Sequence, residues 1–144
     1  MPPHICIIIA KFYQHIADEL LKGALVALEA HSKEITYEVI EVPGAFEIPG
    51  AMSMAIESAR FEGYVALGCV IRGETTHYDY VCAESARGIN QLAIDTQAAL
   101  GYGILTVENE EQALERASVA KGNKGADAVN ACITMIKIKN LMEI

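Results

Sequence analysis

Short apolar runs alternate along the whole chain with longer runs of helical periodicity, and no other feature constrains the fold as strongly. Four strands are predicted, at His4–Ala10, Ile35–Val42, Tyr64–Ile71 and Tyr102–Val107. Helices are predicted at Ile16–His31, Pro49–Ala59 and Val81–Ala98, in a short segment that begins after Asn109, and at Gly125–Asn140. We therefore expect a single α/β domain over residues 1–144, a three-layer α/β/α sandwich around a four-stranded parallel sheet with flavodoxin-like winding.

The charge balance limits the partners that such a chain can bind. Nineteen Asp and Glu residues stand against eleven Lys and Arg residues, which gives a formal charge of −8. Nucleic-acid binding needs a basic surface, and an acidic surface also repels an anionic membrane. The longest apolar runs, Ile5–Ala10 and Val65–Leu67, are far shorter than the roughly 20 residues that span a bilayer. We therefore expect no nucleic-acid or membrane partner, and an anionic substrate would need a few locally placed cations.

Cysteine and histidine positions argue against a disulfide framework or a metal site. Cys6, Cys69, Cys82 and Cys132 form no close pair, and three of them lie in apolar runs, so we expect reduced, mostly buried thiols. The chain also enters its first strand without a charged or cleavable leader, which predicts a cytoplasmic protein. The four histidines are scattered and no dinucleotide or metal-binding motif is present, so neither a metal nor a cofactor is expected.

Three loops are expected to meet at one edge of the sheet, because parallel sheets bind ligands beyond the carboxyl ends of their strands. The segments that follow the first three strands are Lys11–Gln14, Val42–Glu47 and Arg72–Tyr80. In the last of them, Gly73 and the hydroxyl residues after it could present backbone N–H groups to an anion, and His77 could transfer protons near neutral pH. The alternative is a polar loop in which Thr75 or Asp79 caps a helix.

Aromatic side chains in the other two loops predict a site for a planar ring. Phe46 lies between two prolines, and a stiffened platform of this kind loses little freedom when a ring stacks on it. Phe12 and Tyr13 lie in the first loop, so rings from two loops could face a flat heteroaromatic ligand. The alternative is that Phe46 packs inward and Glu47 caps the next helix.

Two cations near helix starts are candidates for binding an anion in so acidic a chain. Arg116 lies on the predicted helix after the fourth strand, and an arginine can bind a phosphate through two hydrogen bonds. Lys124 precedes the last helix, in a Lys-Gly-Asn-Lys-Gly run that lacks the spacing of a P-loop and predicts a turn. The alternative for Arg116 is a solvated helix surface near Gln112 and Glu115.

Two predicted helices carry more apolar surface than one face of a sheet can bury. The helix that contains Gly23–Leu28 is apolar nearly all round. The last helix has two apolar stripes, one at Val129, Cys132, Ile133 and Ile136 and another at Ala128, Ala131, Met135, Ile138 and Met142. Since monomers rarely expose large apolar patches, we expect a homo-oligomer.

Four motifs, taken in order and spacing, resemble those of a known family. They are Val42–Pro49, Ala66–Asp79, Gly103–Thr106 with Glu111–Ala113 and Arg116–Ala117, and Asn123–Gly125. With them, the chain resembles the lumazine synthase family over essentially its whole length. The resemblance implies a transferase of riboflavin biosynthesis, at its penultimate step. Its substrates would be 5-amino-6-ribitylaminouracil and 3,4-dihydroxy-2-butanone 4-phosphate, and its products 6,7-dimethyl-8-ribityllumazine, phosphate and water.

The resemblance also implies a role for each site residue. On the pyrimidine side, Phe12 would stack on the ring. The ring and the ribityl chain would be lined by Ala45, Phe46 and Glu47. Backbone atoms would make further contacts, from Cys69, Val70 and Ile71. Those at the butanone phosphate would be Glu74, Thr75 and Arg116, with Lys124 at the periphery. His77 would be the proton-transfer residue, without metal or cofactor.

An assembly is implied as well. In this family the site lies between neighbouring subunits of a homopentamer, and an aromatic at the position of Tyr102 reaches over from the next chain. Decamers and icosahedral shells are multiples of the pentamer, and riboflavin synthase is a further partner that the resemblance suggests. The surplus apolar helix faces agree with such an assembly.

Some residues depart from the family pattern, and two other functions stay open. Tyr13 stands where asparagine is common, Tyr102 where phenylalanine is common, and Ala98–Gly101 lacks the usual proline.

A non-catalytic lumazine- or flavin-binding protein or storage shell would keep the aromatic platform but would need neither His77 nor Arg116, so their joint presence favours the enzyme. A flavodoxin-like signalling or redox module would need an acceptor aspartate or a hydroxyl-rich loop after the first strand, and this chain has neither there.

Overall fold

The computed structural model describes residues 2–144, which contain one parallel sheet of four strands in the order β2-β1-β3-β4. The strands are β1 (His4–Ala10), β2 (Thr36–Val42), β3 (Gly63–Ile71) and β4 (Leu100–Val107). The helices within this range are α1 (Gln14–His31), α2 (Ile48–Glu57), α3 (His77–Thr96), α4 (Glu110–Ala117) and α5 (Lys124–Leu141), with a 3-10 turn, η1 (Ala45–Glu47), before α2.

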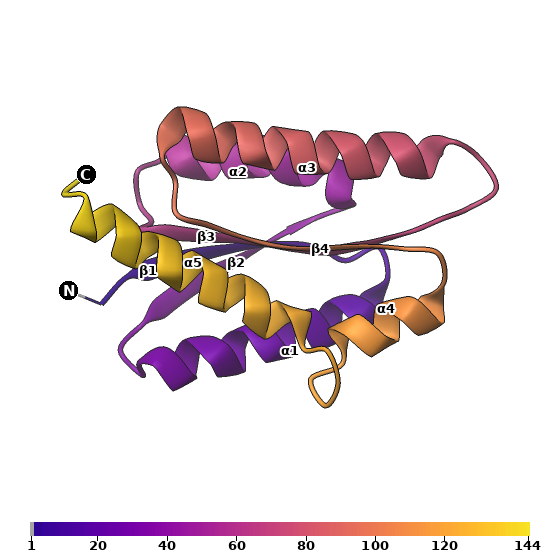
Figure 1. Ribbon diagram of the computed structural model, residues 1–144, viewed down its shortest axis with the longest axis horizontal. Coiled ribbons are helices and arrows are strands. Elements are labelled where there is room, and N and C mark those ends of the chain that lie inside the picture. Colours follow the sequence, from indigo (N-terminus) through magenta and orange to yellow (C-terminus); the bar gives the residue numbers. More distant parts are fainter. Residues whose placement is uncertain (1) are drawn as a thin grey trace.

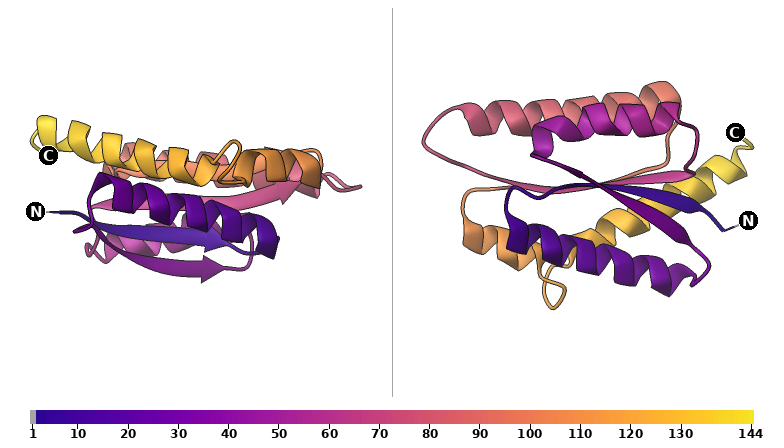
Figure 2. Two further views of the ribbon diagram at one scale, coloured as in Figure 1. Left: turned by 90° about the horizontal axis from the view of Figure 1, so that it is seen from below. Right: turned by 180° about the vertical axis from the view of Figure 1, so that it is seen from behind.

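Helices cover both faces of the sheet, so the three-layer α/β/α sandwich is confirmed (Figure 1). α1, α4 and α5 pack on one face and α2 and α3 on the other, as two further views show (Figure 2). The alternation of side chains along β1 builds both cores, because successive strand residues point to opposite faces. Ile5, Ile7 and Ile9 are buried beneath α1 and α5, whereas Cys6 and Ile8 are buried beneath α2 and α3.

The winding of the chain reverses between β1 and β3, which are neighbours in the sheet. The chain leaves β1 toward α1 on one face and leaves β3 toward α3 on the other. A crevice opens where two such loops part, beyond the carboxyl ends of the strands. This is the edge at which the sequence predicts a site.

The start of α3 differs from the prediction. The helix begins at His77 and not at Val81, so four residues expected in a loop form its first turn. Tyr78 and Cys82, one helical turn apart, both pack against the core beneath α3. Tyr78 is half-buried in an otherwise exposed, polar stretch, and the packing of its ring stabilises this turn.

The start of β4 is also earlier than predicted, at Leu100 and not at Tyr102. Leu100 pairs with Tyr64 and Gly101 with Val65, which extends the ladder between β3 and β4 by two residues. Gly101 lies directly beneath α5, where an added Cβ would approach the Ala128 carbonyl oxygen to 1.8 Å. The absence of a side chain at Gly101 therefore lets α5 pack closely against the sheet.

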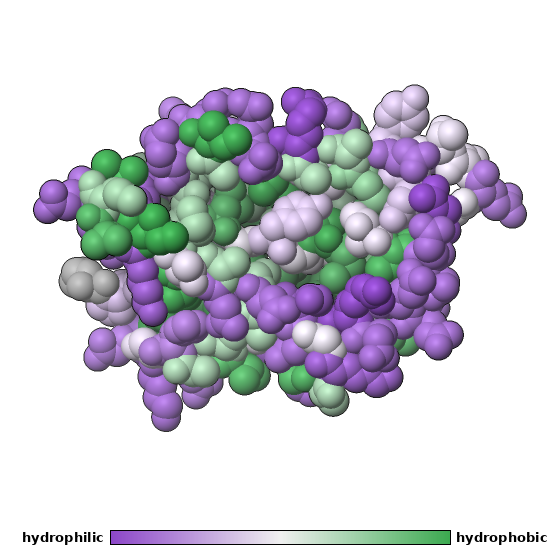
Figure 3. All heavy atoms as spheres, in the orientation of Figure 1, coloured by the Kyte–Doolittle hydropathy of each residue, from purple (hydrophilic) through white to green (hydrophobic). Residues whose placement is uncertain are grey.

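Apolar side chains remain exposed around β4, between α3 and α5 (Figure 3). A shallow hollow of about 590 Å³ on this face includes Leu100, Tyr102 and Met135 in its lining. The second stripe of α5 is exposed at Met135, Ile138 and Met142, as predicted, although Ala128 is buried. Within residues 2–144, no helix combines the length and the apolar character that crossing a membrane requires.

Candidate active site

A pocket of about 600 Å³ opens at the carboxyl edge of the sheet, between the loops that follow β1, β2 and β3. The first two loops contribute Phe12, Tyr13, Pro43, Gly44, Ala45, Phe46 and Glu47 to its lining, and the segment from the end of β3 into α3 contributes Cys69, Val70, Ile71, Gly73, Thr75, His77, Tyr78 and Val81. Most of the residues singled out from the sequence therefore meet here. The exceptions are Glu74, Tyr102, Arg116 and Lys124.

Two exposed aromatic rings line this pocket. Phe12 is 73% exposed and Phe46 is 55% exposed, so the alternative in which Phe46 packs into the core is wrong. Glu47 stands at the N-cap position of α2, but its side chain makes no capping hydrogen bond. An exposed ring gains free energy when a planar ligand covers its face, so the pocket suits a flat heteroaromatic molecule.

His77 begins α3 at the edge of the pocket. Its backbone N–H donates to Thr75 Oγ1 at 3.3 Å, which gives Thr75 part of the capping role considered as an alternative. Among residues 2–144, the imidazole of His77 has no hydrogen-bond partner. Its ring nitrogens are therefore free to exchange protons with a bound substrate.

In the described part of the chain, the pocket of a single copy lacks a lysine or arginine that could bind a phosphate. Among the described residues that line it, none is a lysine or an arginine, and Glu47 adds an acidic side chain. Arg72 follows β3 but is occupied by carboxylates: its Nε donates to Glu108 at 2.9 Å and its Nη1 lies 3.4 Å from Asp79. The hydrogen bond to Glu108 is the main reason why the pKa of Arg72 lies above its ordinary value.

Arg116 lies on a different face of the sheet. Its Nη1 donates to the Gln112 carbonyl of its own helix at 3.0 Å, and its side chain lines a shallow hollow on α4. α4 and α3 cover opposite faces of the sheet (Figure 1). Within residues 2–144, Arg116 and His77 line two separate hollows.

The other three exceptions are also apart from the pocket. Tyr102 is 43% exposed on β4 and lines the hollow between α3 and α5. Lys124 begins α5 and forms an ion pair with Asp127 at 3.3 Å. Glu74 is exposed in the segment before α3.

Burial keeps the thiol in the pocket protonated. It raises the pKa of Cys69 to about 12, with Cys82 as the lesser cause. All four cysteines are free and three are buried, as predicted, with Cys82 half-buried. Because the thiolate is the reactive form, Cys69 offers an apolar, unreactive surface to a ligand. In the described part of the chain, no three His, Cys, Asp or Glu side chains are grouped so that they could hold a metal ion.

Sequence reasoning missed Tyr78 and Val81 as lining residues. It placed the segment before Val81 in a loop, whereas both residues line the pocket from the first turns of α3. A signal was available, because the predicted helix face with Cys82 and Ser85 extends one turn back to Tyr78.

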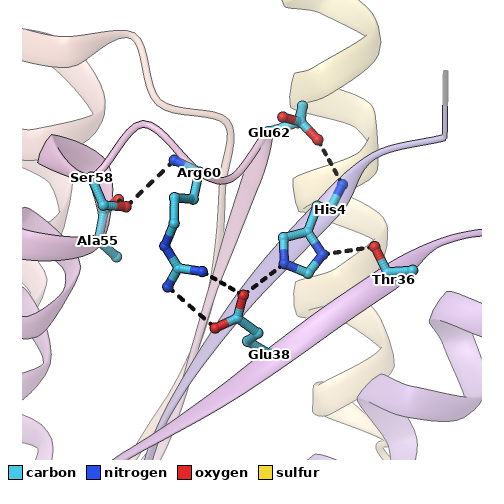
Figure 4. Close-up of polar contacts among 7 residues, drawn as sticks. All are labelled: His4, Thr36, Glu38, Ala55, Ser58, Arg60 and Glu62. Atoms are coloured by element: carbon cyan, nitrogen blue, oxygen red, sulfur yellow. Dashed lines mark hydrogen bonds and ion pairs between the residues drawn. The ribbon is translucent and has the colours of Figure 1, made fainter.

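A second hollow, of about 1130 Å³, lies at the opposite, amino end of the sheet and is lined by none of the predicted site residues. Beside it, Glu38 accepts hydrogen bonds from Arg60 at 2.7 Å and forms an ion pair with His4 at 2.8 Å (Figure 4). The other ring nitrogen of His4 bonds Thr36 Oγ1 at 2.7 Å, and the His4 ring stacks on Phe61. These groups satisfy one another, so the cluster ties β1 to β2. The predicted site residues line the carboxyl-edge pocket instead, which is therefore the candidate site.

Comparison with known proteins assigns a family to this arrangement. The family model described as 6,7-dimethyl-8-ribityllumazine synthase matches residues 2–140. The chain is 53% identical to the 6,7-dimethyl-8-ribityllumazine synthase of Erythrobacter litoralis, over 93% of this chain and 94% of that protein. It is 50% identical to 6,7-dimethyl-8-ribityllumazine synthase 1 of Rhizobium meliloti, over 96% and 92%, and 51% identical to the Zymomonas mobilis protein of the same name, over 92% and 94%.

Proposed function

The chain belongs to the 6,7-dimethyl-8-ribityllumazine synthase family, and we propose that it carries out that family's reaction in the carboxyl-edge pocket. The reaction is a step of riboflavin biosynthesis, the condensation of 5-amino-6-ribitylaminouracil with 3,4-dihydroxy-2-butanone 4-phosphate. Phosphate and water are released with the lumazine. The observation that carries the assignment is the convergence of both phenylalanines and His77 on one pocket.

The pyrimidine binds on the aromatic side of the pocket. Phe12 stacks on its ring, while Phe46 and Glu47 line the space for the ring and the ribityl chain, with Ala45 behind them. Backbone groups of Cys69, Val70 and Ile71, at the end of β3, contact the ring edge. This arrangement is supported by the exposure of both rings and by the apolar character of the protonated Cys69 thiol.

The butanone phosphate binds where a second copy of the chain completes the pocket. A phosphate requires a cation, and the described residues that line the pocket of one chain include no lysine or arginine. Arg116 is exposed on α4, with its guanidinium bound to its own helix. A neighbouring copy therefore supplies Arg116 to the phosphate, opposite Glu74 and Thr75 of the first chain.

Two further residues come from the same neighbour. Tyr102 is half-exposed on β4 and reaches the pyrimidine side of the adjacent pocket, and its hydroxyl finds a partner or water there. Lys124 lines the phosphate end at a greater distance. Its exposed ion pair with Asp127 contributes little stability, so it can be given up.

The pocket acts mainly by holding two reactive molecules together. The aromatic amine attacks the ketone carbon and loses water to form an imine, elimination releases phosphate, and the second amine closes the ring with loss of another water. Correct orientation of the reactants lowers such barriers by roughly 7–11 kcal/mol. His77 moves the protons in these steps, and its contribution to the rate is at most about 10²–10⁴-fold.

The assembly is a homopentamer or a multiple of it, including a decamer or an icosahedral shell, and it acts in the cytoplasm. The support is the apolar surface between α3 and α5, which includes Leu100, Tyr102 and Met135 and which we call the apolar band (Figure 3). A second copy of the chain would bury this band. Riboflavin synthase, which would consume the lumazine, is the further protein partner of this assembly.

Mixing the purified protein with both substrates tests the function. Lumazine fluorescence should appear together with one phosphate for each lumazine formed. A non-catalytic lumazine- or flavin-binding protein would bind added lumazine but release no phosphate, and that result would contradict the proposal.

A further inference from the structure

The first turn of α3, which carries His77, is weakly fixed by its own capping groups. Thr76 stands at the N-cap position, but its side chain makes no capping hydrogen bond. The His77 N–H makes a long bond of 3.3 Å to Thr75 Oγ1. Because side-chain caps normally fix the free N–H groups of a helix start, other contacts must hold this turn.

Arg72 makes a large part of those contacts, beside the packing of Tyr78 against the core and the backbone hydrogen bond from Asp79 N–H to the Thr76 carbonyl. Its guanidinium lies over the Tyr78 ring, 4.3 Å from the ring centre, and its Nη1 lies 3.4 Å from Asp79 Oδ1. Tyr78 and Asp79 directly follow His77 in the chain. A planar guanidinium can stack on an aromatic ring and bind carboxylates at its edge at the same time.

Arg72 is itself anchored to the sheet. Its backbone N–H donates to the Val107 carbonyl at 2.9 Å, and its Nε donates to both carboxylate oxygens of Glu108, at 2.9 and 3.1 Å. Glu108 is held in turn, because its N–H donates to Gln112 Oε1 at 2.8 Å. A continuous set of contacts therefore runs from the ends of β3 and β4 through Arg72 to the turn that carries His77.

We propose that Arg72 is a positioning residue of the reaction, which fixes the His77 imidazole against the pocket by holding Tyr78 and Asp79. The inference rests on the proposed proton-transfer role of His77. Arg72 does not line the pocket, so it acts through α3 and not by touching a substrate. A misplaced acid–base group slows proton transfer but leaves the binding surfaces intact, so the effect belongs in kcat and not in KM.

Replacing Arg72 tests the proposal. Arg72→Met should lower kcat roughly 3- to 10-fold, less than the full contribution of a positioned acid–base group. The KM of each substrate should stay within about twofold of wild type. Arg72→Lys keeps the charge but loses the planar stack, so its kcat should lie between those of Arg72→Met and wild type. Both variants should fold, since exposed ion pairs add little stability.

A double-mutant cycle separates positioning from other roles. In a His77→Asn background, Arg72→Met should cause no further loss of kcat, because the residue that it positions is already gone. An equal loss in both backgrounds would overturn the proposal, and so would a raised KM for the butanone phosphate with kcat intact. If His77→Asn alone leaves kcat unchanged, the proton-transfer role of His77 fails, and the proposal that depends on it fails too.

The chain offers a matched control at the other end of the sheet. Arg60 binds Glu38 through two hydrogen bonds, at 2.7 and 3.2 Å (Figure 4). Its guanidinium also lies over the Phe61 ring, 4.7 Å from the ring centre. Arg60→Met therefore removes the same kinds of contact far from His77, and its kcat should equal that of wild type. Asp79→Asn, a milder change on the α3 side, should lower kcat in the same direction as Arg72→Met. A loss of kcat in Arg60→Met as large as that in Arg72→Met would contradict a specific role for Arg72.

Discussion

In the proposed mechanism, Arg116 binds the butanone phosphate and His77 transfers protons. Arg116→Ala should raise the KM for the butanone phosphate about 10- to 100-fold, because charge-assisted hydrogen bonds to the phosphate are lost. His77→Ala should lower kcat by a smaller factor, since orientation of the reactants supplies most of the rate. Steady-state kinetics with each substrate varied in turn measure both effects. A near-normal KM for the butanone phosphate in Arg116→Ala would refute this division.

The buried thiols should make the fold sensitive to alkaline pH. Burial raises the pKa of Cys6 to about 11 and that of Cys132 to about 12, from an ordinary value of 9.0. Between about pH 9 and pH 11 the unfolded chain therefore loses thiol protons that the folded chain retains, and the free energy of unfolding falls as pH rises. Urea unfolding across this range should show the decline.

Cys132→Ala is the control for the thiol effect. Removing this thiol should make the decline in unfolding free energy between about pH 9 and pH 11 shallower than in wild type. An unchanged slope would show that other groups, and not the Cys132 thiol, cause the alkaline loss of stability.

At the scale of the elements, close contact between α5 and the sheet depends on a missing side chain. Gly101→Ala would place a Cβ 1.8 Å from the Ala128 carbonyl oxygen, a clash with the backbone of α5 that only a shift of the helix or the strand could relieve. Overpacking of this kind costs about 1–3 kcal/mol of stability or more. Chemical denaturation of the variant should show that loss.

Gly50→Ala is the matched control for Gly101→Ala. No atom lies within 4 Å of the position that its Cβ would take on α2, and Ala is favoured over Gly in a helix by about 0.5–1 kcal/mol. This variant should therefore be as stable as wild type or more stable. Destabilisation of both variants to the same extent would contradict the account of α5 packing.

The sequence predicts the elements better than their starts. Each predicted strand and helix is present, and α4 begins directly after Asn109, as predicted. Asn109 caps this helix by accepting from the Gln112 N–H at 2.9 Å, and the Gln112 side chain accepts in turn from the Glu108 N–H. The first turn of α3 was missed because its stability comes from tertiary contacts of Tyr78 and Arg72, which local periodicity does not record.

For the whole molecule, the sequence predicts where the pocket lies but not where the phosphate-binding residues lie relative to it. It identifies Arg116 as a candidate by residue type alone. The loops after β1, β2 and β3 meet because parallel strands end at a common edge, so the pocket follows from the topology. The position of Arg116 relative to His77 does not follow, since the two lie on opposite faces of one sheet. In the proposed site, a second copy of the chain brings Arg116 to His77.

The assembly prediction concerns the apolar band around β4. Met135 is 42% exposed and lines the hollow between α3 and α5, so Met135→Glu would place a charge in the proposed interface. We expect light scattering to show a pentamer or a larger multiple for wild type and smaller species for this variant.

Met54→Glu provides the control for the assembly. Met54 is 75% exposed on α2, away from the band, so a charge there should leave the mass unchanged. A monomeric wild-type protein, or equal dissociation of both variants, would contradict the proposed interface.

The central claim is that each site takes its pocket from one chain and its phosphate-binding arginine from another. Gly73→Trp should block the pocket without a backbone clash, because no atom lies within 4 Å of the added Cβ. Arg116→Ala should remove the cation but leave the pocket open. Each variant alone should have little activity at low concentrations of butanone phosphate. Unfolding both variants together and reassembling them in equal amounts should restore about a quarter of the sites to the wild-type pair. Reassembled mixtures that are no more active than the average of the two separate variants would contradict a site shared between chains.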